Sequence, residues 1–139
     1  MYLRHLMEKI SIQIPSMPEN IRIVESFIDN AKERFHITDD IYGNIMVAVT
    51  ESVNNAIKHG NSSDKSKVVN ISLSIEPKSL KFVIQDQGSG FDPDSLPDPT
   101  LPENISKPDG RGIFLMRNLC DELVFSDEGR MVEMRFNMN

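Results

Sequence analysis

Polar and apolar residues alternate along the first predicted element of the chain. From Lys9 to Pro15 the alternation has a period of two, which predicts a strand that the proline ends. Ser16, followed by Glu19 three residues later, is typical of a capping box and predicts a helix that starts there and ends near His36. Within this helix, apolar residues recur at helical spacing at Val24, Phe27, Ile28, Ala31 and Phe35.

A second, longer helix is predicted between Thr38 and Gly60. Thr38 or Asp39 can cap its start, and Gly60, after Lys58 and His59, is the usual residue for a left-handed helix end. At about 100° per residue, the apolar side chains gather on one side of this helix. The opposite side carries Asn44, Ala48, Glu51, Asn55 and Lys58. Such a stripe is usually the solvated face of an amphipathic helix.

Two hairpins on either side of a long loop complete the chain. Residues 68–75 and 80–84 alternate around a polar turn and predict the first hairpin. From Gln87 to Gly112 the chain holds five of its eight prolines and four of its seven glycines, which predicts a loop without helix or central strand. The loop is followed by a predicted helix over 113–119, starting at Gly112, and by a second hairpin of 122–126 with 131–136.

The order of these elements, β-α-α-β-β-α-β-β, predicts the fold class. Hairpins pair the strands and the helices are left to cover one face, which gives a two-layer α/β sandwich with a mixed, mostly antiparallel sheet. A chain of 139 residues fits one domain, residues 1–139, that is large enough to bury a core.

Charge and composition exclude several classes of partner. The 15 basic and 21 acidic residues give a net charge of −6, which argues against a nucleic-acid surface and against attraction to anionic lipid. The longest apolar run, Ile45 to Val49, is far short of a membrane span, and no signal-peptide core is present, so we expect a cytoplasmic protein. The lone Cys120 is expected in the core without a chemical role. The expected partner is another protein or a small molecule.

The second helix carries the first candidate for chemistry. Glu51 and Asn55 are four residues apart and therefore point the same way. An Asn side-chain oxygen is a hard, neutral ligand that suits Mg²⁺, which takes most of its octahedral shell from phosphates and water. One turn earlier, a carboxylate can act as general base on a hydroxyl that attacks a terminal phosphate.

Two glycine-containing turns are the other candidates. Asp86 ends an apolar strand and can accept a hydrogen bond from the amino group of adenine, while Gly88 and Gly90 let the backbone close on the base. The ordinary interpretation is a turn after a strand. Gly110-Arg111-Gly112 opens a helix whose free N–H groups favour phosphates, with Arg111 as a planar charged donor. The ordinary interpretation here is a loop end with a surface arginine.

The order of the three segments, with a lid-like loop of about residues 91–109 between the second and third, favours a Mg-ATP site. The stretches 51–60, 86–91 and 110–116 resemble the N box and the two glycine boxes of the gyrase and histidine-kinase ATPase superfamily. The nearest likeness is to its single-domain anti-sigma-factor serine kinases. This resemblance implies the Bergerat-type sandwich, ATP with Mg²⁺, phosphorylation of a serine on a small anti-sigma-factor antagonist, and inhibitory binding of a sigma factor, often by a homodimer.

The resemblance also implies roles for individual residues. By position, the catalytic base is Glu51, the magnesium ligand is Asn55 and the adenine acceptor is Asp86. The base pocket is shaped by Gly88 and Gly90, the phosphates are held by Gly110, Arg111 and Gly112, and His59 is a further contact.

One residue departs from the family pattern. Met131 stands where the family often has a threonine that supports the adenine-binding Asp, and this change is expected to weaken nucleotide binding. The alternative function is therefore a nucleotide-gated interaction module with little or no kinase activity.

Overall fold

The computed structural model describes residues 8–89 and 108–138 and shows five strands and three helices. The strands are β1 (Glu8–Pro15), β2 (Val68–Ile75), β3 (Ser79–Gln85), β4 (Glu122–Ser126) and β5 (Met131–Asn137). The helices are α1 (Ile21–Arg34), α2 (Asp39–Asn55) and α3 (Pro108–Leu119). Short helical turns lie at η2 (Pro18–Asn20), η3 (Ala56–Gly60) and η6 (Asp127–Gly129).

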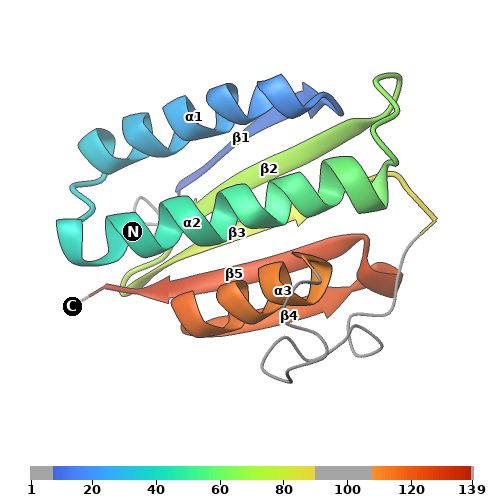
Figure 1. The fold of residues 1–139 in the computed structure, drawn as a ribbon. Helices are drawn as coiled ribbons and strands as arrows, with labels where there is room; N and C mark the ends of the chain where they lie inside the picture. The colour runs from blue at the N-terminus through green and yellow to red at the C-terminus, as the bar shows by residue number, and fades with distance from the viewer. Residues whose placement is uncertain (1–7, 90–107, 139) are drawn as a thin grey trace.

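The sheet has the strand order β1-β2-β3-β5-β4 (Figure 1). It was predicted to be mostly antiparallel, and every pairing of the described strands is antiparallel. Because β5 enters between β3 and β4, the end of β3 lies beside the start of β5. The N–H of Asp86 donates to the carbonyl of Arg130 at 2.9 Å and extends this pairing by one bond.

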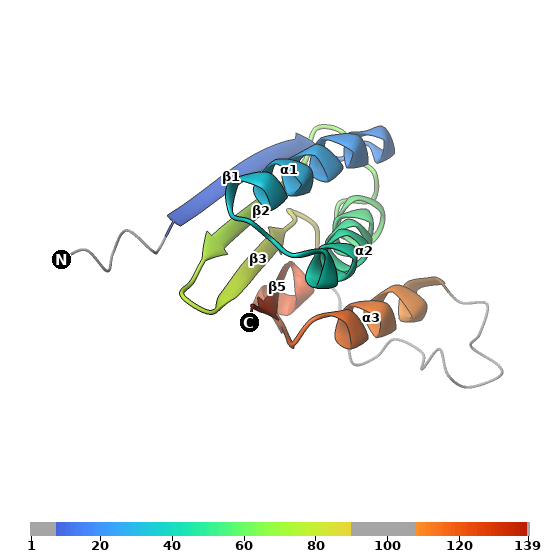
Figure 2. The same ribbon diagram turned by 90° about the vertical axis from the view of Figure 1, so that its left-hand side faces the viewer.

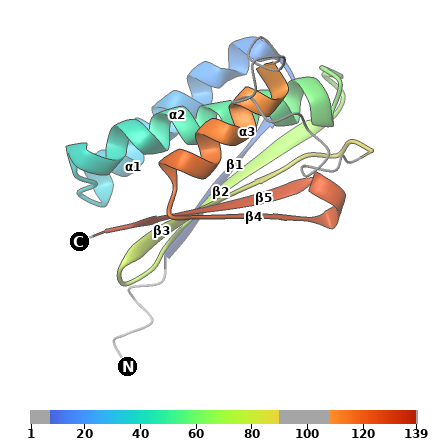
Figure 3. The same cartoon turned by 60° about the horizontal axis from the view of Figure 1, so that its bottom comes forward.

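All three helices cover the same face of the sheet, as Figures 2 and 3 show. The middle helix, α2, lies between α1 and α3 and packs against both (Figure 1). This arrangement confirms the predicted two-layer α/β sandwich.

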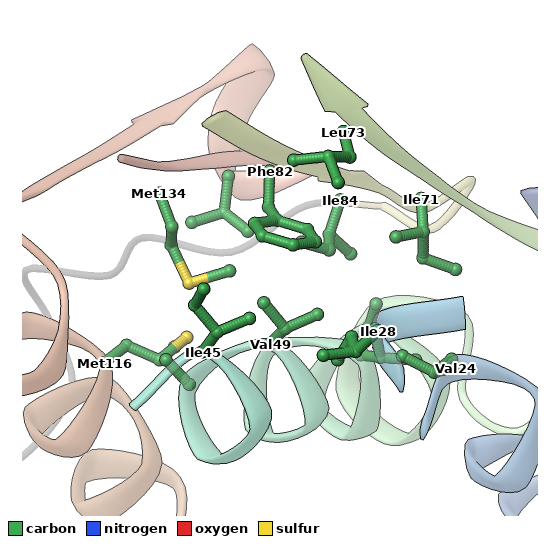
Figure 4. Packing of buried hydrophobic residues seen from close by; sticks show 14 of the residues in the cluster. Val24, Ile28, Ile45, Val49, Ile71, Leu73, Phe82, Ile84, Met116 and Met134 are labelled. Atoms are coloured by element: carbon green, nitrogen blue, oxygen red, sulfur yellow. The ribbon is translucent and has the colours of Figure 1, made fainter. Parts of the chain in front are cut away.

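The core fills the space between the two layers (Figure 4). Ile71, Leu73, Phe82, Ile84 and Met134 point from the sheet toward Val24, Ile28, Ile45, Val49 and Met116 on the helices. Full burial of each such side chain stabilises the fold by about 1.5–3 kcal/mol relative to leaving it exposed. The alternation of apolar residues along the strands therefore fixes which sheet face the helices cover. Cys120 packs half-buried against this core, as expected.

The predicted capping box at Ser16 is wrong. The structure starts the helical segment with η2, which begins at Pro18, and α1 follows from Ile21. Instead of capping a helix, the buried Ser16 hydroxyl donates to the Lys67 carbonyl at 2.8 Å and accepts from the Asn61 amide at 2.8 Å. Tertiary hydrogen bonds thus replace the local one.

The predicted left-handed helix end at Gly60 is also wrong. After α2 the chain continues through a π-helical turn, η3, and Gly129 has the only positive φ among the glycines of the described ranges. The reason for a glycine at position 60 is space rather than backbone conformation, as the site below shows.

The third helix begins earlier than predicted, at Pro108 instead of Gly112. Proline is tolerated in a first helical turn, so the composition of the loop does not prevent a helix there. Two residues of the predicted lid, 108 and 109, therefore belong to α3, while the rest of the lid and Gly90 lie outside the described residues.

Candidate functional site

Glu51 and Asn55 lie one turn apart on α2, and both side chains are half-buried. The interpretation of their stripe as a solvated face holds for Asn44 and Lys58, which are exposed. It is wrong between them, because Ala48 is fully buried and α3 packs against α2 there. A Cβ atom added to Gly112 would lie 3.1 Å from Glu51 Oε2 and 3.2 Å from Asn55 Nδ2. The N-terminal half of α3, at Gly112, thus lies directly against the two candidate side chains of α2.

Asp86 follows the last residue of β3 and is only 6% exposed. Its Oδ1 accepts a hydrogen bond from the N–H of Gly88 at 2.8 Å. Burial raises the pKa of this carboxyl, while the Gly88 N–H and the charge of Arg130 act in the opposite direction. The buried carboxylate has a remaining oxygen with which it can accept from a ligand.

Two glycines allow the turn after β3, which contains Asp86 and Gly88, to lie against the end of η3 at Gly60. A Cβ on Gly60 would lie 2.4 Å from the Asp86 carboxyl carbon, and one on Gly88 would lie 1.6 Å from the Gly60 carbonyl oxygen. Neither position can accept a side chain without moving backbone or the carboxyl group. The glycines are therefore required for close approach, which a simple turn after a strand does not explain.

A hollow beside Asp86 joins these elements. It is lined by Ser52, Asn55, Ala56, Ile84, Asp86, Ile113, Met116, Phe125, Gly129, Arg130 and Val132. The C-terminal end of α2, the start of α3 and the turn between β4 and β5 lie at the same end of the sandwich (Figure 1). Apolar walls with a few convergent polar groups are typical of a small-molecule site.

The other predicted contacts are placed less closely. Gly110 and Arg111 lie in the first turn of α3. First-turn N–H groups have no acceptor within the helix and can therefore bind an anion. His59 lies exposed on η3 and is not among the residues that line the hollow. Within residues 8–89 and 108–138 no cluster of three or more His, Cys, Asp or Glu side chains is arranged for a metal ion.

Met131 does not lie beside Asp86, where the resemblance to the family implied a residue that supports the adenine-binding carboxylate. It pairs with Gln85 in the β3–β5 register, and the alternation of β5 turns it to the face away from the helices. Its neighbours Arg130 and Val132 line the hollow instead. The residue beside Asp86 at this point is therefore an arginine.

Sequence reasoning also missed Asn61, which is fully buried beneath the Asp86 turn. Its amide donates to Ser16 Oγ at 2.8 Å and to the Val68 carbonyl at 3.0 Å, and its Oδ1 accepts from the Gln87 N–H at 2.7 Å. These partners are distant in the chain, and no local pattern marks Asn61 as their link.

A comparison with known families accounts for this architecture. The family model for the histidine kinase-like ATPase domain matches residues 14–136. The chain belongs to this family. Membership agrees with the sandwich and with the placement of the three boxes around one hollow.

Individual relatives of this ATPase-family chain are serine-protein kinases named RsbW. The one from Staphylococcus aureus (strain JH9) is 29% identical over 133 residues, covering 90% of this chain and 84% of the relative. That from Bacillus subtilis (strain 168) is 28% identical over 137 residues, with 94% and 86% covered. That from Oceanobacillus iheyensis is 25% identical over 132 residues, with 90% and 84% covered. These similarities confirm the predicted resemblance to the anti-sigma-factor serine kinase group and an ATP-binding, kinase-like domain.

In the described part of the chain, no helix combines the length and the apolar character that crossing a membrane requires.

Proposed function

We propose that this chain is an ATP-dependent protein-serine kinase that phosphorylates a small antagonist protein and also binds a sigma factor or a similar regulator. The lack of space at Gly112 beside Glu51 and Asn55 carries the proposal, because it sets the N-terminal half of α3, a carboxylate and an amide side by side. A protein that only bound nucleotide would not need a carboxylate at that place.

The proposed site divides the work between its two ends. At the buried end, Asp86 accepts a hydrogen bond from the adenine amino group in the hollow that it lines with Asn55. At the other end, the first N–H groups of α3 hold phosphate oxygens. Glu51 accepts the proton of the attacking serine hydroxyl. As the proton leaves, the serine oxygen bonds to the terminal phosphorus, and the bond between that phosphorus and ADP breaks.

The residues present fit a magnesium ion. The Asn55 side-chain oxygen is a hard ligand at the edge of the hollow, and Mg²⁺ is commonly held by one or two protein oxygens together with phosphates and water. When bound, the ion neutralises charge on the phosphates. The role of the protein is to place Asn55 and Glu51 on successive turns of one helix.

Phosphate transfer from labelled ATP to serine-bearing candidate partner proteins tests the proposal. Glu51→Gln keeps the shape of the side chain and removes the base, so the transfer rate should fall about 10²- to 10⁴-fold while the Kd for Mg-ATP changes less than about twofold. Glu33→Gln, on the exposed side of α1, is the matched control and should leave both unchanged.

Other outcomes separate the alternatives. Binding of Mg-ATP without transfer to any partner would favour the nucleotide-gated interaction module. Full transfer by Glu51→Gln would show that Glu51 is not the base, and absence of ATP binding by the wild type would contradict the whole proposal.

A further inference from the structure

Arg130 is the charged residue nearest to the adenine end of the hollow that no proposed role yet uses. It lies between η6 and β5, it lines the hollow together with Asp86, and 25% of its side chain is exposed. An arginine whose guanidinium reached a ligand would leave donors free toward the hollow. The hydrogen bonds of this one show a different use.

The guanidinium of Arg130 makes its hydrogen bonds to other groups of the protein. Its Nε donates to the Gly88 carbonyl at 2.8 Å and its Nη2 donates to the Ser89 carbonyl at 3.1 Å. Its Nη1 donates to the carbonyl and to Oδ1 of Asp127, at 3.1 and 3.3 Å. Four of the donor directions of the fork are thus occupied. Arg130 holds the turn after β3 and does not have to touch the ligand itself.

The held turn is the one that orients Asp86. The Gly88 carbonyl accepts from Arg130, and the N–H of the same residue donates to Asp86 Oδ1 at 2.8 Å. The Asp86 N–H in turn donates to the Arg130 carbonyl at 2.9 Å. Asp86, Gly88 and Arg130 therefore form a closed ring of hydrogen bonds, with the second carboxylate oxygen left over.

We propose that Arg130 is a positioning residue for adenine recognition, which fixes the Asp86 carboxylate through the carbonyls of Gly88 and Ser89. The inference rests on the proposed nucleotide site and assigns its base selectivity to a residue of the last hairpin. It also answers the departure at Met131, because the support expected from a threonine hydroxyl comes from the guanidinium of the preceding residue.

The positioning role requires a planar side chain with two hydrogen-bond donors in fixed directions. Two adjacent carbonyls, those of Gly88 and Ser89, accept from two different nitrogens of one planar group. A lysine ammonium carries the same charge but has no rigid fork and can satisfy only one of these carbonyls at its best geometry. Lysine at this position should therefore restore part of the effect.

The test compares ATP with purine riboside 5′-triphosphate, which lacks the 6-amino group that Asp86 is proposed to accept from. Calorimetry with magnesium present gives both Kd values for the wild type, Arg130→Met and Arg130→Lys. The wild type should prefer ATP by about tenfold or more, as expected for a hydrogen bond to a charged group. In Arg130→Met the ATP affinity should fall about tenfold while the analogue changes less than about twofold; Arg130→Lys should lie between.

Arg135→Met is the matched control. Arg135 lies five residues further along, on β5, and has two ion-pair partners, Glu76 at 3.2 Å and Glu122, but the alternation of β5 turns it away from the hollow. Its replacement removes an equally engaged guanidinium and should leave the preference for ATP at the wild-type value. Thermal unfolding of each variant shows whether it is folded under the binding conditions.

Two results would overturn the inference while the nucleotide site stands. Equal losses for ATP and for the analogue in Arg130→Met would reduce Arg130 to a general structural role. A wild type that binds both nucleotides equally would show that Asp86 does not read the amino group. A wild type that binds neither nucleotide would instead remove the proposed function, and the positioning role with it.

Discussion

The two walls of the candidate pocket are built by different means. The wall at the end of β3 is closed by hydrogen bonds and by the absence of space, since Gly60, Gly88 and Asp86 leave no room for one more carbon atom. The wall formed by α3 rests on side-chain packing: Ile113 and Met116 are buried, and a Cβ added to Gly112 would lie 3.1 Å from the flexible end of Glu51.

This difference separates two kinds of sensitivity. A small added group in the wall near Asp86 must move backbone atoms, so it should directly weaken the binding of the base. A change of the same size in α3 meets the ends of Glu51 and Asn55, which can shift by a few tenths of an ångström. It should therefore affect phosphate transfer more than binding.

The largest expected effect is that of Gly88→Ala. The new Cβ would lie 1.6 Å from the carbonyl oxygen of Gly60, so the turn has to open. Strain of this kind typically costs about 1–3 kcal/mol, which corresponds to a loss of roughly five- to 150-fold in Mg-ATP affinity if it falls on the site. Titration calorimetry and thermal unfolding measure the two parts of the loss.

The control for this change is Gly43→Ala. Gly43 lies exposed on α2, nothing lies within 4 Å of an added Cβ, and alanine is the better helix former by about 1 kcal/mol. The variant should be as stable as the wild type or more so, with unchanged ATP affinity. Equal behaviour of the two alanine variants would contradict the claim that the wall at Asp86 has no spare room.

A smaller effect is expected from Asp86→Asn, with opposite signs for binding and stability. A neutral acceptor makes a weaker hydrogen bond, so Mg-ATP affinity should fall about five- to tenfold at pH 7. Burial raises the pKa of Asp86 from 3.8, so the folded protein holds this proton more tightly than the unfolded chain does. Folding stability is then lost as pH rises from about 3.8 through the raised pKa, and Asp86→Asn avoids this loss.

Two pH series check this prediction. The unfolding temperature of the ligand-free Asp86→Asn protein should exceed that of the wild type at pH 7, and the difference should shrink as the pH is lowered toward 4. The ATP affinity of the wild type should weaken over the same descent, because protonation removes the charged acceptor. A variant that is less stable at pH 7 and gains nothing with rising pH would show that burial of the carboxylate costs the fold nothing.

The smallest effect is expected from Gly112→Ala. The added Cβ would lie 3.1 Å from Glu51 Oε2 and 3.2 Å from Asn55 Nδ2, and both side chains can give way. Helix propensity favours the alanine by about 1 kcal/mol, so the unfolding temperature should stay level or rise slightly. The rate of phosphate transfer should fall a few-fold with little change in Kd. A loss of binding as large as that of Gly88→Ala would abolish the contrast between the walls.

Local patterns predicted most of the fold. The period-two alternation located β1, β2 and β3, and helical spacing located α1 and α2, because burial against one face repeats in the sequence itself. The polar turn between β4 and β5 located these two strands as a hairpin. The three boxes likewise predicted Glu51, Asn55 and Asp86 as neighbours of one hollow, two of which line it.

Features that depend on distant partners escaped sequence reasoning. Ser16 looked like a helix cap because its competing partner, the Lys67 carbonyl, is 51 residues away. Gly60 was assigned a backbone role because the Asp86 carboxyl that fills its side-chain space is not visible locally. No local pattern marks Arg130 as important, because its partners Gly88 and Ser89 lie beside it only as a result of the β3–β5 pairing.

Calorimetric titration of ATP into the wild type and Asn55→Ala, each with Mg²⁺ and with a chelator, tests most directly that both walls serve one Mg-ATP site. The account predicts one ATP per chain for the wild type, clearly tighter with Mg²⁺, and little magnesium dependence for Asn55→Ala. Equal magnesium dependence in both proteins would contradict the placement of the ion at Asn55, and no binding by the wild type would contradict the site as a whole.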